Sequence, residues 1–268
     1  MAPTPLLELR GIDKSFGPVQ VLHDVGLSVY AGEVTALVGD NGAGKSTLVK
    51  CISGIYPIDA GTVTFDGNQV AIHSPRDASA LGIEVEYQDL ALCDNLDIVQ
   101  NMFLGREKVK GIVLDEPTME QMAGDTLAGL SVRTVKSLRQ LVASLSGGQR
   151  QTVAIAKAVL WNSRIVILDE PTAALGVAQT AQVLELVRRL ADNGLGVVLI
   201  SHNMNDVFAV SDRIAALYLG RTATQVKASE VTHSQVVELI TAGRSGNLGL
   251  PPEKPSDFVD ITPPGDER

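Results

Sequence analysis

The sequence predicts an α/β fold built around a mainly parallel sheet. Three short apolar runs carry this prediction: Val34–Val38, Ile165–Leu168 and Val197–Ile200. Runs this short and this apolar are typical of strands buried on both faces. Between the last two runs, Val177–Ala191 places apolar side chains on one face of a helix. A strand, a helix and a strand in succession imply a right-handed crossover, which makes the two strands parallel.

The N-terminal part is expected to be rich in strands. Residues 6–38 alternate in part between apolar and polar side chains and contain glycine turns. Ser46–Ser53 is predicted to be a helix that ends near Gly54. A hairpin follows, with strands Thr62–Phe65 and Gln69–Ile72 on either side of an Asp-Gly turn.

The middle of the chain, roughly residues 74–160, is predicted to be mostly helical. Its expected helices are Arg76–Leu81, Ile98–Leu104, Thr118–Leu130 and Gly148–Trp161. Further on, the pattern predicts a strand at Ile214–Leu219 and a closing helix at Glu230–Thr241. Residues 243–268 hold five of the 12 prolines and four glycines, which predicts a poorly ordered tail.

The composition excludes several classes of protein. The chain has 268 residues, of which 22 are basic and 31 acidic, and its net charge of −9 argues against nucleic-acid binding and against a polybasic hold on a membrane. Cys51 and Cys93 are too few for a disulfide framework, so we expect reduced thiols in a cytosolic protein. The longest apolar runs have four residues. A membrane span needs about 20, so the chain is not expected to cross a bilayer by itself, and its first residues do not resemble a signal peptide.

A phosphate-binding loop follows the first buried strand. Residues 39–46 read Gly-Asp-Asn-Gly-Ala-Gly-Lys-Ser and match G-x-x-x-x-G-K-[ST]. Glycines let successive N–H groups turn toward phosphate oxygens, and the helix that follows adds its positive end. Lys45 would contact the β and γ phosphates, and Ser46 would ligate Mg²⁺. A chance glycine-rich turn is the alternative, which the flanking strand and helix disfavour. The predicted nucleotide-binding residues are Gly39, Asn41, Gly42, Ala43, Gly44, Lys45, Ser46 and Thr47.

Two acids follow the second buried strand. The apolar run 165–168 delivers Asp169 and Glu170 at its carboxyl end, where open α/β sheets bind ligands. Asp169 would hold Mg²⁺ through water, and Glu170 could polarise an attacking water as a general base. The alternative for an Asp-Glu pair after a strand is a helix N-cap. The phosphate-binding loop favours the catalytic interpretation.

The same letters occur a second time. Leu114–Thr118 reads Leu-Asp-Glu-Pro-Thr, as Leu168–Thr172 does. Only a short apolar run precedes the first copy, and Asp115 stands two positions before Pro117, an arrangement typical of an N-cap. We therefore predict a capping role for Asp115 and Glu116.

A second anion site is expected at Leu145–Gln149, which reads Leu-Ser-Gly-Gly-Gln at the start of a predicted helix. One domain cannot easily wrap one ATP with both anion sites. The order of these motifs resembles the ABC-transporter ATPases, in which the signature loop of one subunit closes on the nucleotide of the other. The resemblance covers about residues 5–242. It implies a P-loop NTPase core with a mainly parallel sheet, an N-terminal antiparallel β subdomain and an inserted α-helical subdomain at about 90–160.

Single positions match the family's motifs. Phe16 resembles the aromatic residue that stacks on adenine, with a core strand residue as the alternative. Gln88 resembles the glutamine that touches Mg²⁺ and water and senses the transport partner. His202 resembles the histidine that contacts the γ-phosphate, with a structural role as the alternative. The resemblance thus implies catalytic roles for Lys45, Gln88, Glu170 and His202, metal ligation by Ser46, Gln88 and Asp169, and binding of the opposing subunit's nucleotide by Ser146, Gly147, Gly148 and Gln149.

The resemblance extends to a subclass. Residues 89–107 and 173–177 resemble bacterial monosaccharide importers of the ribose, xylose and fructose kind. Gly176 departs from the family, which usually has at this position an aspartate that helps couple the two sites. The implied cofactors are ATP and Mg²⁺. The implied partners are a second copy (or a second ABC ATPase) and a membrane permease with a sugar-binding protein, at the cytoplasmic face of the membrane.

Two other functions stay open. A non-transport ABC ATPase acting on DNA or ribosomes would carry a coiled-coil insertion, or tandem domains with basic linkers, which this sequence lacks. A non-enzymatic nucleotide-binding module is disfavoured by Glu170 and His202.

Overall fold

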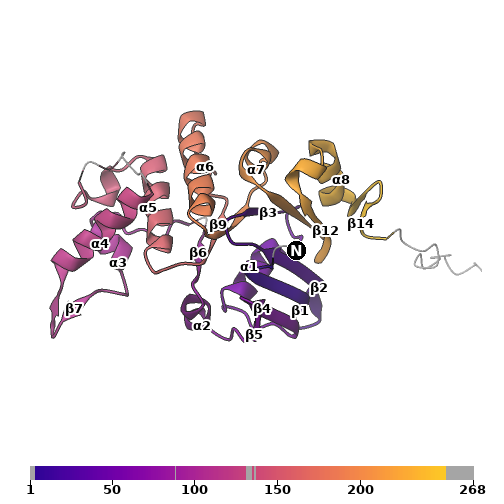
Figure 1. Cartoon of the computed structure of the whole chain (residues 1–268), viewed down its shortest axis with the longest axis horizontal. Helices are drawn as coiled ribbons and strands as arrows, with labels where there is room; N and C mark the ends of the chain where they lie inside the picture. Colours follow the sequence, from indigo (N-terminus) through magenta and orange to yellow (C-terminus); the bar gives the residue numbers. More distant parts are fainter. Residues whose placement is uncertain (1–3, 88, 131–134, 136, 252–268) are drawn as a thin grey trace, which may run out of the picture.

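A six-stranded sheet forms the centre of the computed structural model, which describes residues 4–87, 89–130, 135 and 137–251 (Figure 1). The strand order is β12-β11-β3-β10-β9-β6. The five strands from β11 to β6 are parallel and β12 is antiparallel, which confirms the mainly parallel sheet. Their bounds are β3 Val34–Gly39, β6 Ile83–Glu86, β9 Ile165–Asp169, β10 Gly196–Ile200, β11 Arg213–Tyr218 and β12 Arg221–Lys227.

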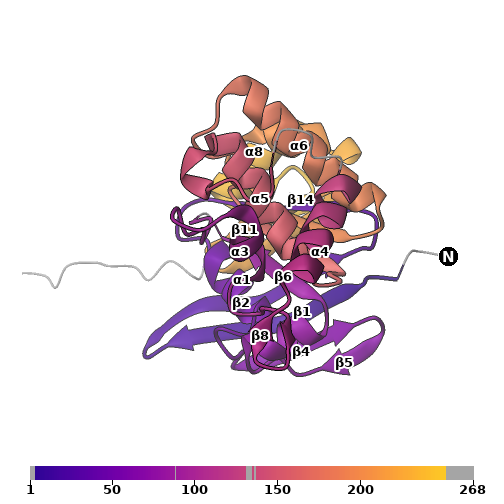
Figure 2. The same ribbon diagram turned by 90° about the vertical axis from the view of Figure 1, so that its left-hand side faces the viewer.

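A four-stranded antiparallel sheet with the order β2-β1-β4-β5 lies against one face of the central sheet. Its strands are β1 Leu7–Phe16, β2 Val19–Val29, β4 Ala60–Phe65 and β5 Asn68–Val70. The predicted hairpin around Asp66-Gly67 is β4–β5. In Figure 2 this sheet forms the lower part of the molecule, below α5, α6 and α8.

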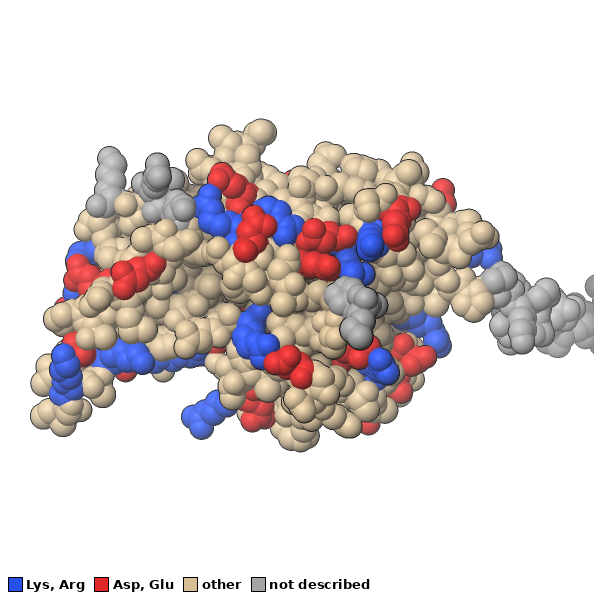
Figure 3. Space-filling model, in the orientation of Figure 1, with Lys and Arg blue, Asp and Glu red and all other residues tan. Residues whose placement is uncertain are grey.

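The helices are α1 Lys45–Ile52, α2 Pro75–Ala80, α3 Ile98–Phe103, α4 Glu116–Gly129, α5 Gly147–Val159, α6 Val177–Asp192, α7 Met204–Val210 and α8 His233–Ala242. Short 3-10 turns occupy Val142–Ser144 and Ala228–Glu230. None of the helices in the described ranges is long and apolar enough to cross a membrane. In Figure 3, acidic and basic side chains lie next to one another in a band across the upper middle of the face shown, and much of the rest of that face carries neither.

Both faces of the central sheet are buried, because successive residues of a strand point to opposite faces. In β9, Ile165 and Ile167 pack with α1 and the antiparallel sheet, whereas Val166 and Leu168 pack with α3, α4, α5 and α6. Helix α6 buries the apolar face that the sequence predicts. The carboxyl ends of β3, β9 and β10 therefore meet at one edge of a sheet that is fixed from both sides.

Two expectations about these elements need correction, and two elements were not predicted. The poorly ordered tail is wrong for residues 243–251, where β13 (Arg244–Ser245) pairs with β14 (Leu248–Gly249) and buried Ser245 donates to Glu238. Residues 252–268 lie outside the described residues. The middle of the chain is less helical than predicted, because it holds β6 and a hairpin of β7 (Val109–Lys110) and β8 (Val113–Leu114). The sequence pattern did not predict helix α7 or strand β12, because α7 is short and β12 is largely polar.

The predicted limits of the domains remain predictions. Figure 1 shows α3, α4, α5 and the β7–β8 hairpin together at one end of the molecule, and a core of their apolar residues joins them to α6.

Candidate functional site

The phosphate-binding loop joins β3 to α1 in a tight turn. Gly42 and Gly44 have φ angles of 83° and 102°, in the region that favours glycine. A Cβ at Gly44 would lie 2.8 Å from the Leu22 side chain, and one at Gly39 would lie 2.6 Å from the Leu217 carbonyl oxygen. Glycine is therefore required here by close packing against β2 and β11 as well as by the turn.

Lys45 begins α1, and its ammonium group lies under the loop. Its Nζ donates to the carbonyl oxygens of Gly39 at 2.7 Å and Asp40 at 3.1 Å. Burial lowers the pKa of Lys45, and the charges of Glu170, Asp169 and Asp40 oppose this shift. The acids that follow β9 thus act on the lysine of the loop, which puts the two motifs in one site.

The other loop residues differ in exposure. Asn41, Gly42 and Ser46 are exposed, Thr47 is half-buried and Ala43 is buried. The Ala43 N–H donates to the Asp40 carbonyl oxygen at 3.1 Å, so in this conformation it closes the turn. The Ser46 hydroxyl stands in the first turn of α1, where a ligand can reach it.

Asp169 and Glu170 end β9 with unlike environments. Burial and the charge of Glu170 raise the pKa of Asp169, whereas Lys45 and Lys50 oppose the rise. Glu170 has a φ of 54°, a conformation that costs a non-glycine residue on the order of 1 kcal/mol. Its N–H donates to the Ile200 carbonyl oxygen at 3.0 Å, which fixes it to the neighbouring strand.

His202 follows β10 and contacts the predicted base. Its Nδ1 lies 2.8 Å from Glu170 Oε2, and its ring is 79% exposed whereas the Glu170 side chain is 16% exposed. The parallel pairing of β9 with β10 brings the two side chains together. The histidine ring is therefore open to solvent while its Nδ1 contacts the Glu170 carboxylate.

Gln88 lies outside the described residues, so its predicted roles remain predictions. Two positions earlier, sequence reasoning missed Glu86, which is 5% exposed at the end of β6. Neither carboxyl oxygen of Glu86 forms a hydrogen bond with a described residue. Burial raises the pKa of Glu86 to about 8, and the charge of Asp169 adds to the rise. Glu86 alternates with Ile83 and Val85 and shares its register with Glu84, so the sequence pattern gave no signal that it is buried.

Phe16 ends β1 and is not a core residue, because 42% of it is exposed. Its ring meets the Tyr56 ring edge-on at 5.0 Å, and Lys14 Nζ lies 5.5 Å from its centroid. It pairs with Val19 of β2, the strand that also contacts the phosphate-binding loop through Leu22.

The second anion site belongs to a different part of the molecule. Ser146 caps α5, accepting at Oγ from the Gln149 N–H while Gln149 Oε1 accepts from the Ser146 N–H. Ser146 and Gly147 are exposed, whereas Gly148 is buried against Gln179. Helix α5 packs on α3, α4, α6 and β6, whereas α1 packs on β2 and β3 (Figure 1).

The loop before α6 lies beside the signature glycines. A Cβ at Gly147 would lie 3.4 Å from Leu175. Gly176 caps α6 without a side chain of its own, and the Gln179 Oε1 accepts from its N–H at 3.3 Å.

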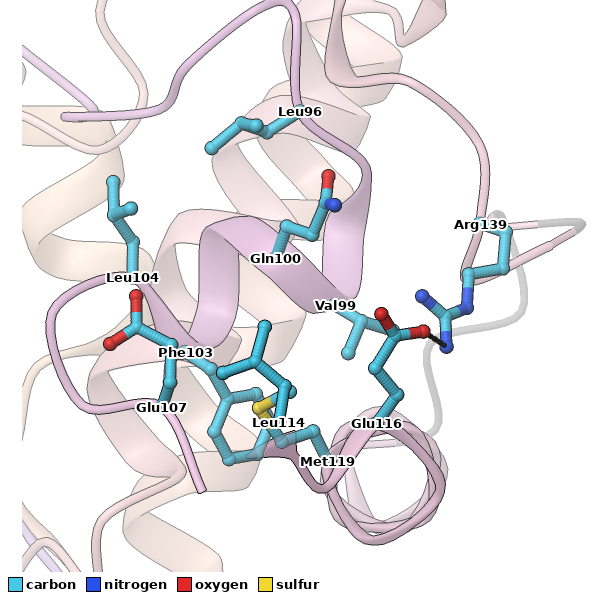
Figure 4. Close-up of a pocket in the computed structure, with 10 residues that line it drawn as sticks. All are labelled: Leu96, Val99, Gln100, Phe103, Leu104, Glu107, Leu114, Glu116, Met119 and Arg139. Atoms are coloured by element: carbon cyan, nitrogen blue, oxygen red, sulfur yellow. Dashed lines mark ion pairs between the residues drawn. The ribbon is translucent and has the colours of Figure 1, made fainter. Parts of the chain in front are cut away.

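The repeated motif caps a helix. Asp115 accepts from the Thr118 N–H at 3.5 Å and from its hydroxyl at 2.7 Å, which confirms its capping role. The prediction is wrong for Glu116, which lies in the first turn of α4 and pairs with Arg139 at 3.0 Å. In Figure 4 this ion pair borders an apolar cavity of about 200 Å³.

Ser46 and Asp169 offer the oxygen ligands that Mg²⁺ prefers. Among the described residues, no three His, Cys, Asp or Glu side chains gather into a protein-only metal cage. A hydroxyl and one carboxylate beside a phosphate-binding loop fit an ion that takes its other ligands from water and phosphate.

Several known proteins resemble this chain in sequence. The sequence model described as "ABC transporter" matches residues 22–173. The xylose/arabinose import ATP-binding protein of Sulfolobus acidocaldarius is 44% identical over 91% of this chain and 97% of its own length. The fructose import ATP-binding protein of Rhizobium meliloti is 44% identical over 91% and 96%. The ribose import ATP-binding protein of Caldanaerobacter subterraneus is 40% identical over 88% of this chain and 47% of its own length.

Solved structures support the fold. A nucleotide-free ATP-binding cassette of an ABC transporter superposes with a TM-score of 0.77 at 24% identity, covering 88% of this chain and 95% of that one. An ATP-binding cassette in its ADP conformation gives 0.76 at 24% identity, with 89% and 96% covered. These likenesses confirm the predicted fold class.

Proposed function

This chain belongs to the ABC transporter family, and we propose that it is the ATP-hydrolysing subunit of an importer that takes up a monosaccharide through a separate permease. The relatives named for xylose/arabinose, fructose and ribose import favour this function over action on DNA or ribosomes. The Glu170–His202 contact at 2.8 Å, beside Lys45, is the observation that carries the catalytic part.

Hydrolysis here requires positioning and charge more than covalent chemistry. The loop amides and Lys45 would hold the triphosphate, and Ser46 and Asp169 would hold Mg²⁺. When bound, Mg²⁺ neutralises charge that develops on the phosphate oxygens. Glu170 orients a water and accepts its proton while the water oxygen bonds to the γ-phosphorus and the bond to the ADP oxygen breaks. His202 keeps the Glu170 carboxylate in place and faces the γ-phosphate.

A two-fold dimer completes the site. Ser146 and Gly147 are exposed on α5, away from the phosphate-binding loop of the same chain, which supports their use by a second subunit. Two copies related by a two-fold axis would enclose two ATP molecules. ATP favours the closed dimer because ATP binds more tightly to the closed dimer than to the open one. Hydrolysis of ATP allows the dimer to open again.

The permease would dock near Gln88. A hollow of about 260 Å³ opens beside β6, lined by residues that include Tyr87, Leu90, Arg106, Lys157 and Trp161. It combines apolar walls with basic side chains and with the acidic Glu84 and Glu86, and this mixed lining suits a cytoplasmic segment of a membrane protein. The chain would thus work at the cytoplasmic face of the membrane, with a sugar-binding protein on the other side.

Glu170→Gln tests this function. The variant is expected to bind ATP, to form a stable dimer in analytical ultracentrifugation and to release phosphate about 10²–10³-fold more slowly. Glu116→Gln is the matched control, because it changes the acid at the same place in the repeated motif, and we expect wild-type turnover. Full activity of Glu170→Gln, or full activity of the wild-type chain as a monomer at every dilution, would contradict the proposal.

A further inference from the structure

The segment 93–97, which follows Gln88, is joined to the chain that leads into the signature loop, here Leu145–Gly148. The Ala143 N–H donates to the Asp94 carbonyl oxygen, and the Val142 N–H donates to the Leu96 carbonyl oxygen, each at 3.1 Å. An isolated antiparallel bridge joins Asp97 to Leu141. These backbone contacts form a short ribbon that joins the two segments directly.

The buried side chain of Asn101 holds the backbone of the segment 93–97 through hydrogen bonds. Its Oδ1 accepts from the Cys93 N–H at 2.7 Å, and its Nδ2 donates to the carbonyl oxygens of Cys93 and Asp97, both at 3.0 Å. Arg139, seen beside Glu116 in Figure 4, also pairs with the Asp97 carboxylate at 3.4 Å. The ribbon is thereby anchored on α3 and α4.

Arg150 connects this ribbon to the helix that carries the signature loop. It lies in the first turn of α5, just after the loop. Its Nη1 lies 3.2 Å from Asp94 Oδ1, its Nη2 donates to the Ala143 carbonyl oxygen at 3.1 Å, and its Nε donates to the Leu145 carbonyl oxygen at 3.3 Å. One guanidinium therefore holds the chain before the loop, the helix after it and the segment 93–97.

We propose that Arg150 is a positioning residue that sets the orientation of Ser146 and Gly147 according to the position of the segment 93–97. The inference rests on the proposed function, in which the signature loop closes on the partner subunit's ATP and the segment after Gln88 faces the permease. A lysine at this position could pair with Asp94, but its single nitrogen cannot hold all three acceptors in the planar geometry of arginine. A displacement of Asp94 would therefore shift the carbonyl groups of Ala143 and Leu145, which precede Ser146 and accept hydrogen bonds from Arg150.

The test measures ATP-driven dimerisation of the full chain in the Glu170→Gln background. Arg150→Lys is expected to raise the dissociation constant of the ATP-bound dimer at least about 10-fold, because charged hydrogen bonds to two carbonyl groups are lost. Asp94→Asn removes only an exposed ion pair, so we expect about a threefold rise. Arg164→Lys is the control, since Arg164 forms a comparable exposed pair with Asp66 at 3.0 Å.

Two further measurements decide the interpretation. The ATP affinity of the dilute Arg150→Lys monomer should match that of the Arg164→Lys control, although its melting temperature falls, because the lost bonds lie within the folded monomer. Asp94→Glu keeps the carboxylate, so it should dimerise as tightly as the background variant. A loss of monomer ATP affinity in Arg150→Lys as large as the loss of dimer affinity would mean a structural role and overturn the proposal. If Ser146→Ala weakens the dimer but Arg150→Lys does not, the positioning role is wrong and the proposed function stands. If ATP does not dimerise the background variant, both fail.

Discussion

Two regions of this chain have the same five letters and different chemistry. Leu168–Thr172 begins at the end of β9, whose apolar residues are fully buried. Leu114–Thr118 begins at the end of β8, a two-residue strand in which Val113 is 65% exposed. The hydroxyl groups of the two threonines have different hydrogen-bond acceptors. Thr118 donates its hydroxyl to Asp115 of its own motif, whereas Thr172 donates to Asp206 of α7, both at 2.7 Å.

This difference leaves Asp169 without the threonine bond that Asp115 has. The hydroxyl of Thr118 lowers the pKa of Asp115, whereas burial raises the pKa of Asp169. An acid that caps a helix is satisfied by its own chain. An acid at the end of a buried strand is available to a ligand, so the preceding strand decides what the motif does.

Among the tests of this comparison, the largest expected difference is between variants of Asp169 and Asp115, the first acids of the two motifs. Asp169→Asn should lower ATP turnover about 10²-fold, because the carboxylate that we propose as a ligand of Mg²⁺ becomes neutral. Asp115→Asn should leave turnover unchanged, because asparagine also caps helices well. Phosphate release at saturating ATP measures both, and equal losses would remove the distinction between the motifs.

Glu86 offers a third environment, a carboxyl group that neither caps nor faces solvent. Its pKa of about 8 lies above the usual value near 4.3, so the folded state holds a proton that the unfolded state has lost. This contribution to stability is complete below the unfolded pKa and is lost as pH rises through about 8. The free energy of unfolding should therefore fall on the order of 3 kcal/mol between pH 5 and 8.

Glu86→Gln should flatten that dependence, since the amide does not titrate. Urea unfolding at several pH values measures the slope, with exposed Glu116→Gln as the control. An unchanged slope in Glu86→Gln would show that the carboxyl group is ionised inside the fold.

The smallest effect separates the two threonines. Thr172→Val removes a donor from buried Asp206 and should lower the free energy of unfolding by about 2 kcal/mol. Thr118→Val leaves Asp115 its backbone donor and Lys110, so about 0.5 kcal/mol is expected. Chemical denaturation resolves the difference, and a larger loss in Thr118→Val would reverse the comparison.

Local pattern was enough to predict the buried strands, the phosphate-binding loop and the capping of α4 by Asp115, because each depends on neighbouring residues. It did not predict β12, whose polar residues bond across to β2. Thr222 exchanges hydrogen bonds with the backbone of Gly26, and Gln225 does so with Ser28. The contact between Glu170 and His202 depends on the adjacency of β9 and β10, and the three bonds of Arg150 depend on the meeting of distant loops.

The small hairpin after α8 has a practical consequence for anyone who shortens or tags this protein. Leu248 and Leu250 cover the core beneath α8, and the Leu250 N–H donates to the Gly243 carbonyl oxygen at 2.8 Å. Ending the chain at the C-terminus of α8 would remove these two side chains and expose the apolar residues beneath them, which favours aggregation. A purification handle belongs beyond residue 251.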